Sequence, residues 1–352
     1  GRCRRPPLLP PRGAALRPAA MADEKPAAPS TLKIFLAFLA CSSLNIFLNF
    51  YNKWVLTADP DYTPPSHEKH SAVALLQTQL YTEVDLHALS DKAPATGAGF
   101  QFPIFYTMFH MWTSVIGSLV LMLIKRPETG MPSFKQLWEY KVGIAGLATC
   151  TVINLACNNA SLTLVSLFLN LIIKAAGPLV GMIASNIVLK RTYSKAMVAS
   201  VVVLAMSAAL SVPYGEGSST MIGILLALIA TVASSTKPVV GELLMSESSK
   251  LPKLTPVVLV FYDTFFAALI MMTLWLSIRS ERVGSADYLK ARPAMGCLIL
   301  AVGSSAAFAY NMSSYYFTMV ASAVVMMVST QLIKIVLVRA LPCLVYPRVL
   351  PL

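Results

Sequence analysis

The chain has 352 residues, of which 56% are hydrophobic and only 12% are charged, and its mean hydropathy is +0.65. These values exclude an ordinary soluble domain, in which about 25% of residues are charged, and they predict an all-α polytopic membrane protein. The formal net charge of +12 does not call for nucleic acid, because basic residues also orient helices in a membrane.

The first residues are rich in arginine and proline, and no acidic residue precedes Met21. We interpret residues 1–20 as upstream translation ahead of a native start at Met21, with an organelle transit peptide as the alternative. The whole stretch 1–31 is predicted to be a disordered tail.

Nine apolar segments are long enough to cross about 30 Å of hydrocarbon, allowing for tilt. They are predicted at 32–56, 100–124, 141–157, 164–189, 196–213, 220–244, 256–278, 294–310 and 317–338. Four of the six cysteines fall within these segments and none forms a CxxC pair. The cysteines are therefore predicted to be packing residues, without a disulfide framework or a zinc site.

The distribution of basic residues favours a cytoplasmic N-terminus, because the loops that would then face the cytoplasm carry more lysine and arginine. The loop predicted at 279–292 is an exception to this bias. The longest connection, 57–99, is rich in acidic residues and is predicted to face the lumen or the exterior. Apolar residues between Val73 and Val84 have near-helical spacing, which predicts an amphipathic surface helix there.

Two lysines interrupt apolar segments, Lys174 in 164–189 and Lys334 in 317–338. Lys174 has about as much apolar sequence before it as after it, which places it near the middle of the bilayer. An ammonium at that depth costs roughly 2.5–3.5 kcal/mol, so it requires a cavity, a counter-charge or a ligand. The pair predicts a carrier that holds an anion between the two lysines.

The two lysines also indicate an internal repeat. A shift of 160 residues superposes Lys174 on Lys334 and aligns further apolar residues around them. Transporters are often built from such related halves. We predict a first repeat at 32–213 and a second at 220–338.

Polar residues share a helix face with each lysine. Ser166, Asn170 and Lys174 are four residues apart, and Thr330 precedes Lys334 by the same step. If it lines a cavity, such a face offers ammonium donors to phosphate and neutral groups to the rest of a ligand. The structural alternative is an inward lysine bonded to helix carbonyls or reaching the interface.

Pro178 follows Lys174 by four residues and lacks the amide that would donate to the Lys174 carbonyl. We therefore predict a bend and a free carbonyl at the depth of the cavity. Gly177 and Gly181 form a small-xxx-small pair, which predicts close approach of another helix.

Tyr262 and Asp263 lie a few residues inside the seventh segment. An intramembrane carboxylate is a candidate coupling group or a partner for a lysine, and Tyr262 is a candidate to stack on a sugar or base. An ordinary interfacial tyrosine is the alternative. Lys237 and Glu242 are predicted to be interfacial, with a role in admitting substrate as the alternative.

Tyr310 and Asn311 are predicted at the end of the eighth segment and complete the candidate binding residues. The sequence contains no HExxH, GxSxG or P-loop motif and no paired carboxylates. The sequence therefore gives no residues on which an enzymatic function could rest, and we predict no catalytic residue, metal or cofactor.

Four short motifs occur along the chain: NFYNKWVL, IIKAAGP followed by LKRTYS, FYD in the seventh segment, and AYN ahead of the Lys334 helix. Together they resemble the triose-phosphate and nucleotide-sugar carriers of the drug/metabolite transporter superfamily, from about Leu32 to Val338. The resemblance implies ten helices in two inverted halves, a midplane site, and exchange of a phosphorylated solute for phosphate or a nucleoside monophosphate. By motif match, Lys174 and Lys334 take the place of the phosphate-binding lysines.

The chain departs from this pattern in ways that bear on its substrate. Ile335 stands where plastid carriers have an arginine after the lysine, and Gly177 stands where they have a glutamate. The FYNN and GALNK motifs of GDP-mannose carriers are only partly present. After Val338, residues 339–352 are proline-rich and leave no room for a tenth helix, so we predict nine helices and a divergent tail.

The predicted function is a Golgi or endoplasmic-reticulum antiporter that exchanges a nucleotide sugar, or another phosphorylated sugar, for a nucleoside monophosphate or phosphate. One alternative is a triose-phosphate or phosphoenolpyruvate exchanger in a plastid-type membrane, and another is a truncated, non-transporting membrane protein. The expected partners are the substrate and the lipid bilayer, without nucleic acid. The sequence leaves a homodimer open.

Overall fold

The computed structural model describes residues 30–56, 98–124, 138–210, 220–246 and 253–333, apart from 101, 163 and 166. Within these ranges all regular secondary structure is helical. The helices are α1 (Thr31–Leu56), α4 (Pro103–Ile124), α6 (Lys141–Leu162), α7 (Leu167–Ala175), α8 (Gly177–Leu189), α9 (Lys195–Leu210), α10 (Met221–Met245), α11 (Pro256–Ser277), α12 (Arg279–Ala291) and α13 (Pro293–Ala321). A further apolar helix, Ala323–Ile333, follows α13.

The helices have the lengths and surfaces of a membrane bundle. Within the described ranges, α1, α4, α10, α11 and α13 are long and apolar enough to cross a membrane, and four shorter apolar helices match the remaining predicted segments. Large apolar side chains stay exposed on their outer faces, as with Ile222 and Leu225 on α10. Exposed apolar surface of this extent is a feature of a lipid-facing protein. The chain is an all-α polytopic membrane protein, as predicted.

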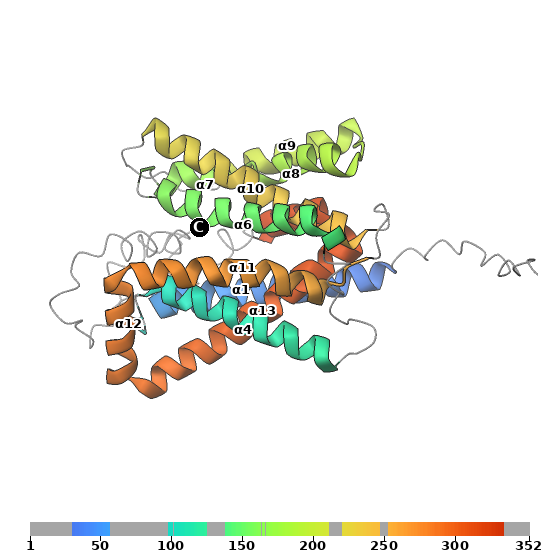
Figure 1. Ribbon diagram of the computed structural model, residues 1–352. Helices are drawn as coiled ribbons and strands as arrows, with labels where there is room; N and C mark the ends of the chain where they lie inside the picture. Colours follow the sequence, from blue (N-terminus) through green and yellow to red (C-terminus); the bar gives the residue numbers. More distant parts are fainter. Residues whose placement is uncertain are drawn as a thin grey trace, which may run out of the picture.

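Figure 1 shows the helices in two layers. The first layer contains α6, α7, α8, α9 and α10, and the second contains α1, α4, α11 and α13. The helix 323–333 belongs to the first layer, because Ala323, Val324 and Met327 pack against α8 and α10. Each layer thus takes helices from both predicted repeats, so the space between the layers is not the boundary between the repeats.

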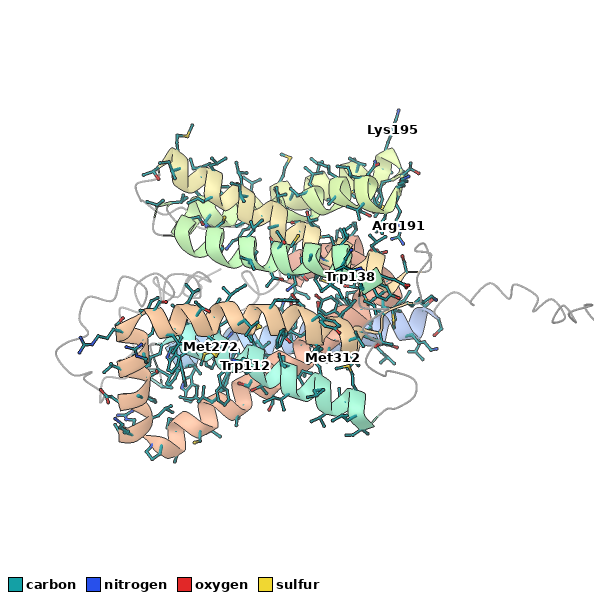
Figure 2. The ribbon with its side chains drawn as sticks, in the orientation of Figure 1. Trp112, Trp138, Arg191, Lys195, Met272 and Met312 are labelled. Atoms are coloured by element: carbon teal, nitrogen blue, oxygen red, sulfur yellow. The ribbon has the colours of Figure 1, made fainter. Side chains whose placement is uncertain are left out.

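The two ends of the bundle differ in what covers them. Arg191, between α8 and α9, and Lys195, the first residue of α9, mark one end, which we call the Arg191 end (Figure 2). The helix α12 lies across the opposite end of the second layer, the α12 end (Figure 1). The α1 helix starts at the Arg191 end, where Ile34 and Ala37 pack against Phe317 of α13.

An apolar cluster joins the two layers near the Arg191 end. It includes Leu147 of α6, Leu244 of α10, Val260 of α11 and Tyr315 of α13, all of them buried. Between membrane helices, close packing of this kind is a main source of association, because lipid is as apolar as the side chains. The layers are therefore held together at the end where α6 and α11 begin.

The prediction of a loop at 279–292 is wrong, because residues Arg279–Ala291 form the amphipathic helix α12. Buried Glu281 accepts a hydrogen bond from the Phe105 amide at 3.3 Å, and the Tyr288 hydroxyl donates to the Ala98 carbonyl at 2.6 Å. Arg282 donates to the Leu276 carbonyl at the end of α11, at 2.6 Å. Arg282, one of the four basic residues that opposed the positive-inside bias, thus caps the end of α11.

The predicted boundary between the eighth and ninth segments is also wrong. The prediction ended one at residue 310 and began the next at 317, whereas α13 runs to Ala321 and is broken only at Ser322. Ser322 has a φ of 124°, which non-glycine residues rarely adopt. The Glu242 carboxylate accepts from the Ala323 amide at 2.7 Å, so a buried side chain satisfies the first donor of the next helix.

The amphipathic helix predicted between Val73 and Val84 lies outside the described residues, as do residues 1–29 and 334–352.

Candidate functional site

The helix that carries Lys174 is broken where the sequence predicts a bend. The α7 helix ends at Ala175, Ala176 forms a turn, and α8 begins at Gly177 with Pro178 next. Lys174 is half-buried in the last turn of α7. A cation is favourable there because the helix dipole is negative at its C-terminal end.

The carbonyl of Lys174 is not free, contrary to the prediction. Gln331 of the helix 323–333 donates to it from Nε2 at 3.4 Å. The predicted close approach at the glycines is confirmed. A methyl group on Gly181 would overlap the Met327 side chain, and one on Gly177 would lie 3.3 Å from Ser235 Oγ. The helix leading to Lys334 therefore packs directly on the Lys174 segment, although Lys334 itself lies outside the described residues.

The other stripe residues face protein groups. Asn170 is fully buried, and its Nδ2 donates to Ser161 Oγ at 2.9 Å. Its Oδ1 is buried and has no hydrogen-bond partner among the described residues. The Thr330 hydroxyl donates to the Met326 carbonyl of its own helix at 2.9 Å, a common arrangement for threonine inside a helix. Ser166 lies outside the described residues.

The remaining candidates come from the second layer. Tyr262 of α11 is half-buried and lies edge-on to Phe261, with ring centroids 5.2 Å apart. Tyr310 and Asn311 were predicted at the end of a segment, but both are half-buried well inside α13. The candidates thus belong to both layers, with Lys174, Asn170 and Thr330 in the first.

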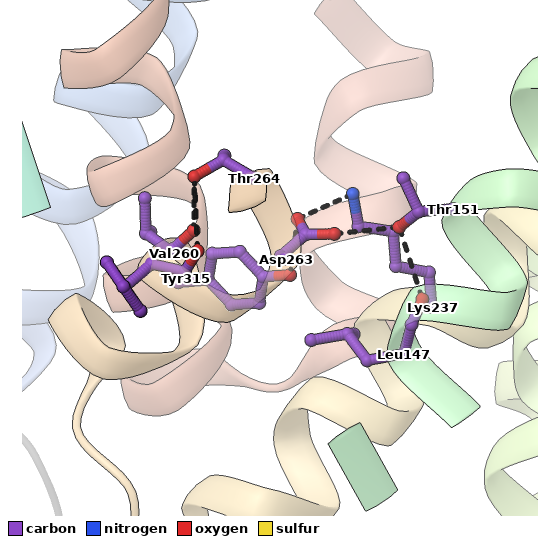
Figure 3. Close-up of polar contacts among 8 residues, drawn as sticks. Leu147, Thr151, Lys237, Val260, Asp263, Thr264 and Tyr315 are labelled. Carbon is purple, nitrogen blue, oxygen red and sulfur yellow. Dashed lines mark hydrogen bonds and ion pairs between the residues drawn. The ribbon is translucent and has the colours of Figure 1, made fainter. Parts of the chain in front are cut away.

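A polar network connects the layers around Asp263 (Figure 3). The buried Asp263 carboxylate accepts from Thr151 Oγ1 at 2.7 Å and from the Tyr315 hydroxyl at 2.9 Å. Lys237 Nζ lies 2.7 Å from Asp263 Oδ2. Three donors from α6, α10 and α13 therefore converge on one carboxylate of α11. Hydrogen bonds to a charged group in a dry interior are among the stronger ones.

This network corrects one prediction and completes another. Lys237 is not interfacial, because it lies eight residues before Met245, the last residue of α10, or about 12 Å along the helix. Asp263 does serve as the partner of a lysine, but the lysine is Lys237. The sequence signal was available, since Lys237 interrupts an apolar segment just as Lys174 does. Thr151 and Tyr315 gave no signal, because hydroxyl residues are frequent in apolar helices.

Glu242 lies three residues before Met245, the last residue of α10, at the Arg191 end. Its side chain is buried and forms an ion pair with Arg191, besides accepting from the Ala323 amide. This single carboxylate therefore links α10, to which it belongs, with the residues after α8 and with the start of the helix 323–333. It ties three elements together at the Arg191 end.

The Asp263 network lies directly beside the apolar cluster. On each of α6, α10 and α11, the polar residue lies one helical turn from an apolar residue that belongs to the cluster or packs against it. In each case the polar residue is the one nearer the α12 end. The pairs are Leu147 and Thr151, Val240 and Lys237, and Val260 and Asp263. Leu147, Val240 and Val260 thus lie between the network and the Arg191 end.

A comparison with curated proteins gives no match. The family model described as the Triose-phosphate Transporter family matches residues 95–348, a range that contains every described helix except α1. The match begins after the NFYNKWVL motif and reaches ten residues beyond Val338, where the resemblance was predicted to end. Members of this family are transporters rather than enzymes. The chain therefore belongs to the triose-phosphate transporter family and is a membrane transporter of the sugar-phosphate or nucleotide-sugar type.

Proposed function

We propose that the chain is an antiporter that exchanges a nucleotide sugar, or another phosphorylated sugar, for a nucleoside monophosphate or phosphate in the Golgi or endoplasmic reticulum. The observation that carries the proposal is the setting of Lys174. Its ammonium belongs to a helix that breaks inside an apolar segment, against the helix that leads to Lys334. Half-helix ends at the depth of the membrane are a recurring construction of transporter binding sites.

Each candidate residue has a role in this proposal. Lys174 and Lys334 neutralise phosphate, for which a lysine acts as a compact point charge. The neutral groups and the carboxylate line the sugar or base side of the site: Ser166, Asn170, Thr330, Tyr262, Asp263, Tyr310 and Asn311. Support for this side comes from the buried Oδ1 of Asn170, an acceptor without a partner among the described residues.

Charge also supports exchange over one-way transport. A cavity that brings two ammonium groups together is costly inside a membrane when no anion is bound. A carrier of this kind changes conformation more readily with an anion bound, because only a ligand with different affinity for two states shifts their populations. The returning anion then fulfils the same role as the outgoing one.

The test is uptake by the purified chain in liposomes. Vesicles are loaded with a nucleoside monophosphate, with inorganic phosphate or with buffer alone, and a panel of labelled nucleotide sugars is supplied outside. We expect uptake only into loaded vesicles, fastest with the monophosphate inside. Vesicles without protein are the control, and equal uptake into buffer-filled vesicles would contradict exchange.

The second candidate is a triose-phosphate or phosphoenolpyruvate exchanger, favoured by the matched family description. Ile335 and Gly177, which replace the arginine and glutamate of plastid carriers, argue against it. In the same assay this candidate predicts competition by inorganic phosphate and none by nucleoside monophosphate. Absence of any exchange by well-folded protein would instead favour the non-transporting alternative.

A further inference from the structure

We propose that Lys237 is a third anion-binding residue of the transport site, which Asp263 holds in the empty carrier and which a phosphate of the substrate takes over. The inference deepens the proposed function and rests on it. It assigns Asp263 the role of a placeholder for the substrate's negative charge.

The first argument is the unequal anchoring of the two partners. Asp263 keeps hydrogen bonds from Thr151 and Tyr315 when Lys237 leaves, so its carboxylate remains stabilised. Lys237 contacts no acceptor other than Asp263 among the described residues. Since one partner is fixed by two further helices and the other is not, the lysine is the partner that can move.

The second argument is exposure. The Asp263 side chain is 5% exposed, whereas that of Lys237 is 29% exposed. An ammonium has three N–H donors, and Asp263 accounts for one of them. Lys237 can therefore receive phosphate oxygens on its remaining donors before it leaves the carboxylate.

The third argument is position. The apolar cluster lies between the Lys237–Asp263 pair and the Arg191 end, as its residues Leu147 and Val260 show. A ligand that approaches from the α12 side does not have to pass Leu147 and Val260. Lys237 belongs to α10 of the first layer and Asp263 to α11 of the second, so the pair bridges the two layers.

The consequence is a link between anion binding and movement. Removing one partner of a buried ion pair without replacement is strongly unfavourable. A phosphate that replaces Asp263 keeps the ammonium compensated while the bridge between the layers opens. The empty carrier retains the bridge, which is the behaviour that obligatory exchange requires.

The experiment measures the affinity of the detergent-purified full chain for inorganic phosphate and for uridine monophosphate, by ligand-dependent thermal stabilisation. Lys237→Gln should weaken binding of both about ten- to hundredfold, the range for a hydrogen bond to a charged group. Asp263→Asn should tighten binding about tenfold, because the competing carboxylate is gone. The double variant should bind as weakly as Lys237→Gln, and Lys195→Gln, on the exposed start of α9, should bind like the wild type.

A purely structural ion pair gives the opposite pattern. Both single variants would then bind weakly, and the double variant, which has no unpaired charge, would recover wild-type affinity. That pattern, or wild-type affinity in Lys237→Gln, overturns the inference. If Asp263→Asn does not fold, the comparison of Lys237→Gln with the double variant still decides. A wild-type chain that binds neither probe overturns the proposed function and the inference together, whereas the variant pattern overturns the inference alone.

Discussion

Lys174 is predicted to lie at a depth where charge is costly, and the end of α7 that carries it packs against the helix 323–333. We expect Lys174→Ala to abolish exchange in liposomes without reducing membrane insertion. Removing the ammonium relieves an insertion cost of roughly 2.5–3.5 kcal/mol while it deletes the phosphate contact. Lys195→Ala, at the exposed start of α9, is the matched control. Wild-type exchange by a properly inserted Lys174→Ala protein would rule out the assigned role.

Glu242 has two functions that substitutions can separate. Its bond to the Ala323 amide is buried, whereas Arg191 is 45% exposed. An exposed ion pair contributes about 0–1 kcal/mol, but an unsatisfied buried donor costs about 1–3 kcal/mol. We expect Glu242→Ala to lower the thermal midpoint clearly, and Arg191→Gln to lower it little. Equal losses in the two variants would show that the ion pair, not the amide bond, is the main contribution.

At the scale of elements, the contact between α10 and the turn after α6 depends on a glycine. A methyl group on Gly223 would lie 2.6 Å from Leu164 Cβ and 2.9 Å from the Leu164 backbone carbon. Backbone cannot move aside as a flexible side chain can, so Gly223→Ala should destabilise the protein by about 1–3 kcal/mol. Gly146→Ala in α6 is the control, because a methyl group there meets no atom within 4 Å of the described structure. Thermal unfolding of the two variants in detergent should therefore differ in direction or in size.

At the scale of the whole molecule, the two ends of the bundle must face opposite sides of the membrane. The connection between Leu56 and Ala98 leaves from the α12 end, where Val55 and Ala98 pack with Tyr288. The connection between Met245 and Lys253 leaves from the Arg191 end. We expect a glycosylation acceptor inserted in the first connection to be modified in microsomes and one in the second to stay unmodified. The reverse pattern would mean that the N-terminus is lumenal.

Much of the architecture follows from composition and periodicity. Each apolar helix of the described residues falls in a predicted apolar run, because a helix that crosses a membrane must be apolar over about 20 residues. Pro178 predicted the break beside Lys174, and Gly177 and Gly181 predicted the close helix contact. The motif resemblance around these residues indicated the family, which the match over residues 95–348 confirms. These are local properties, fixed by residue type and spacing along one helix.

The tertiary structure decided which polar groups meet. Asp263 finds Lys237, Thr151 and Tyr315 on three other helices, and no spacing along the sequence encodes that encounter. The break at Ser322 has no glycine or proline to announce it, and Glu242, eighty-one residues earlier in the chain, bonds the next amide. The sequence by itself determined where the apolar stretches of the chain lie and which residues are costly in a membrane, although it missed α12 and the true end of α13. Only packing determined their partners, because a buried polar group is satisfied by whatever the fold places within about 3 Å of it.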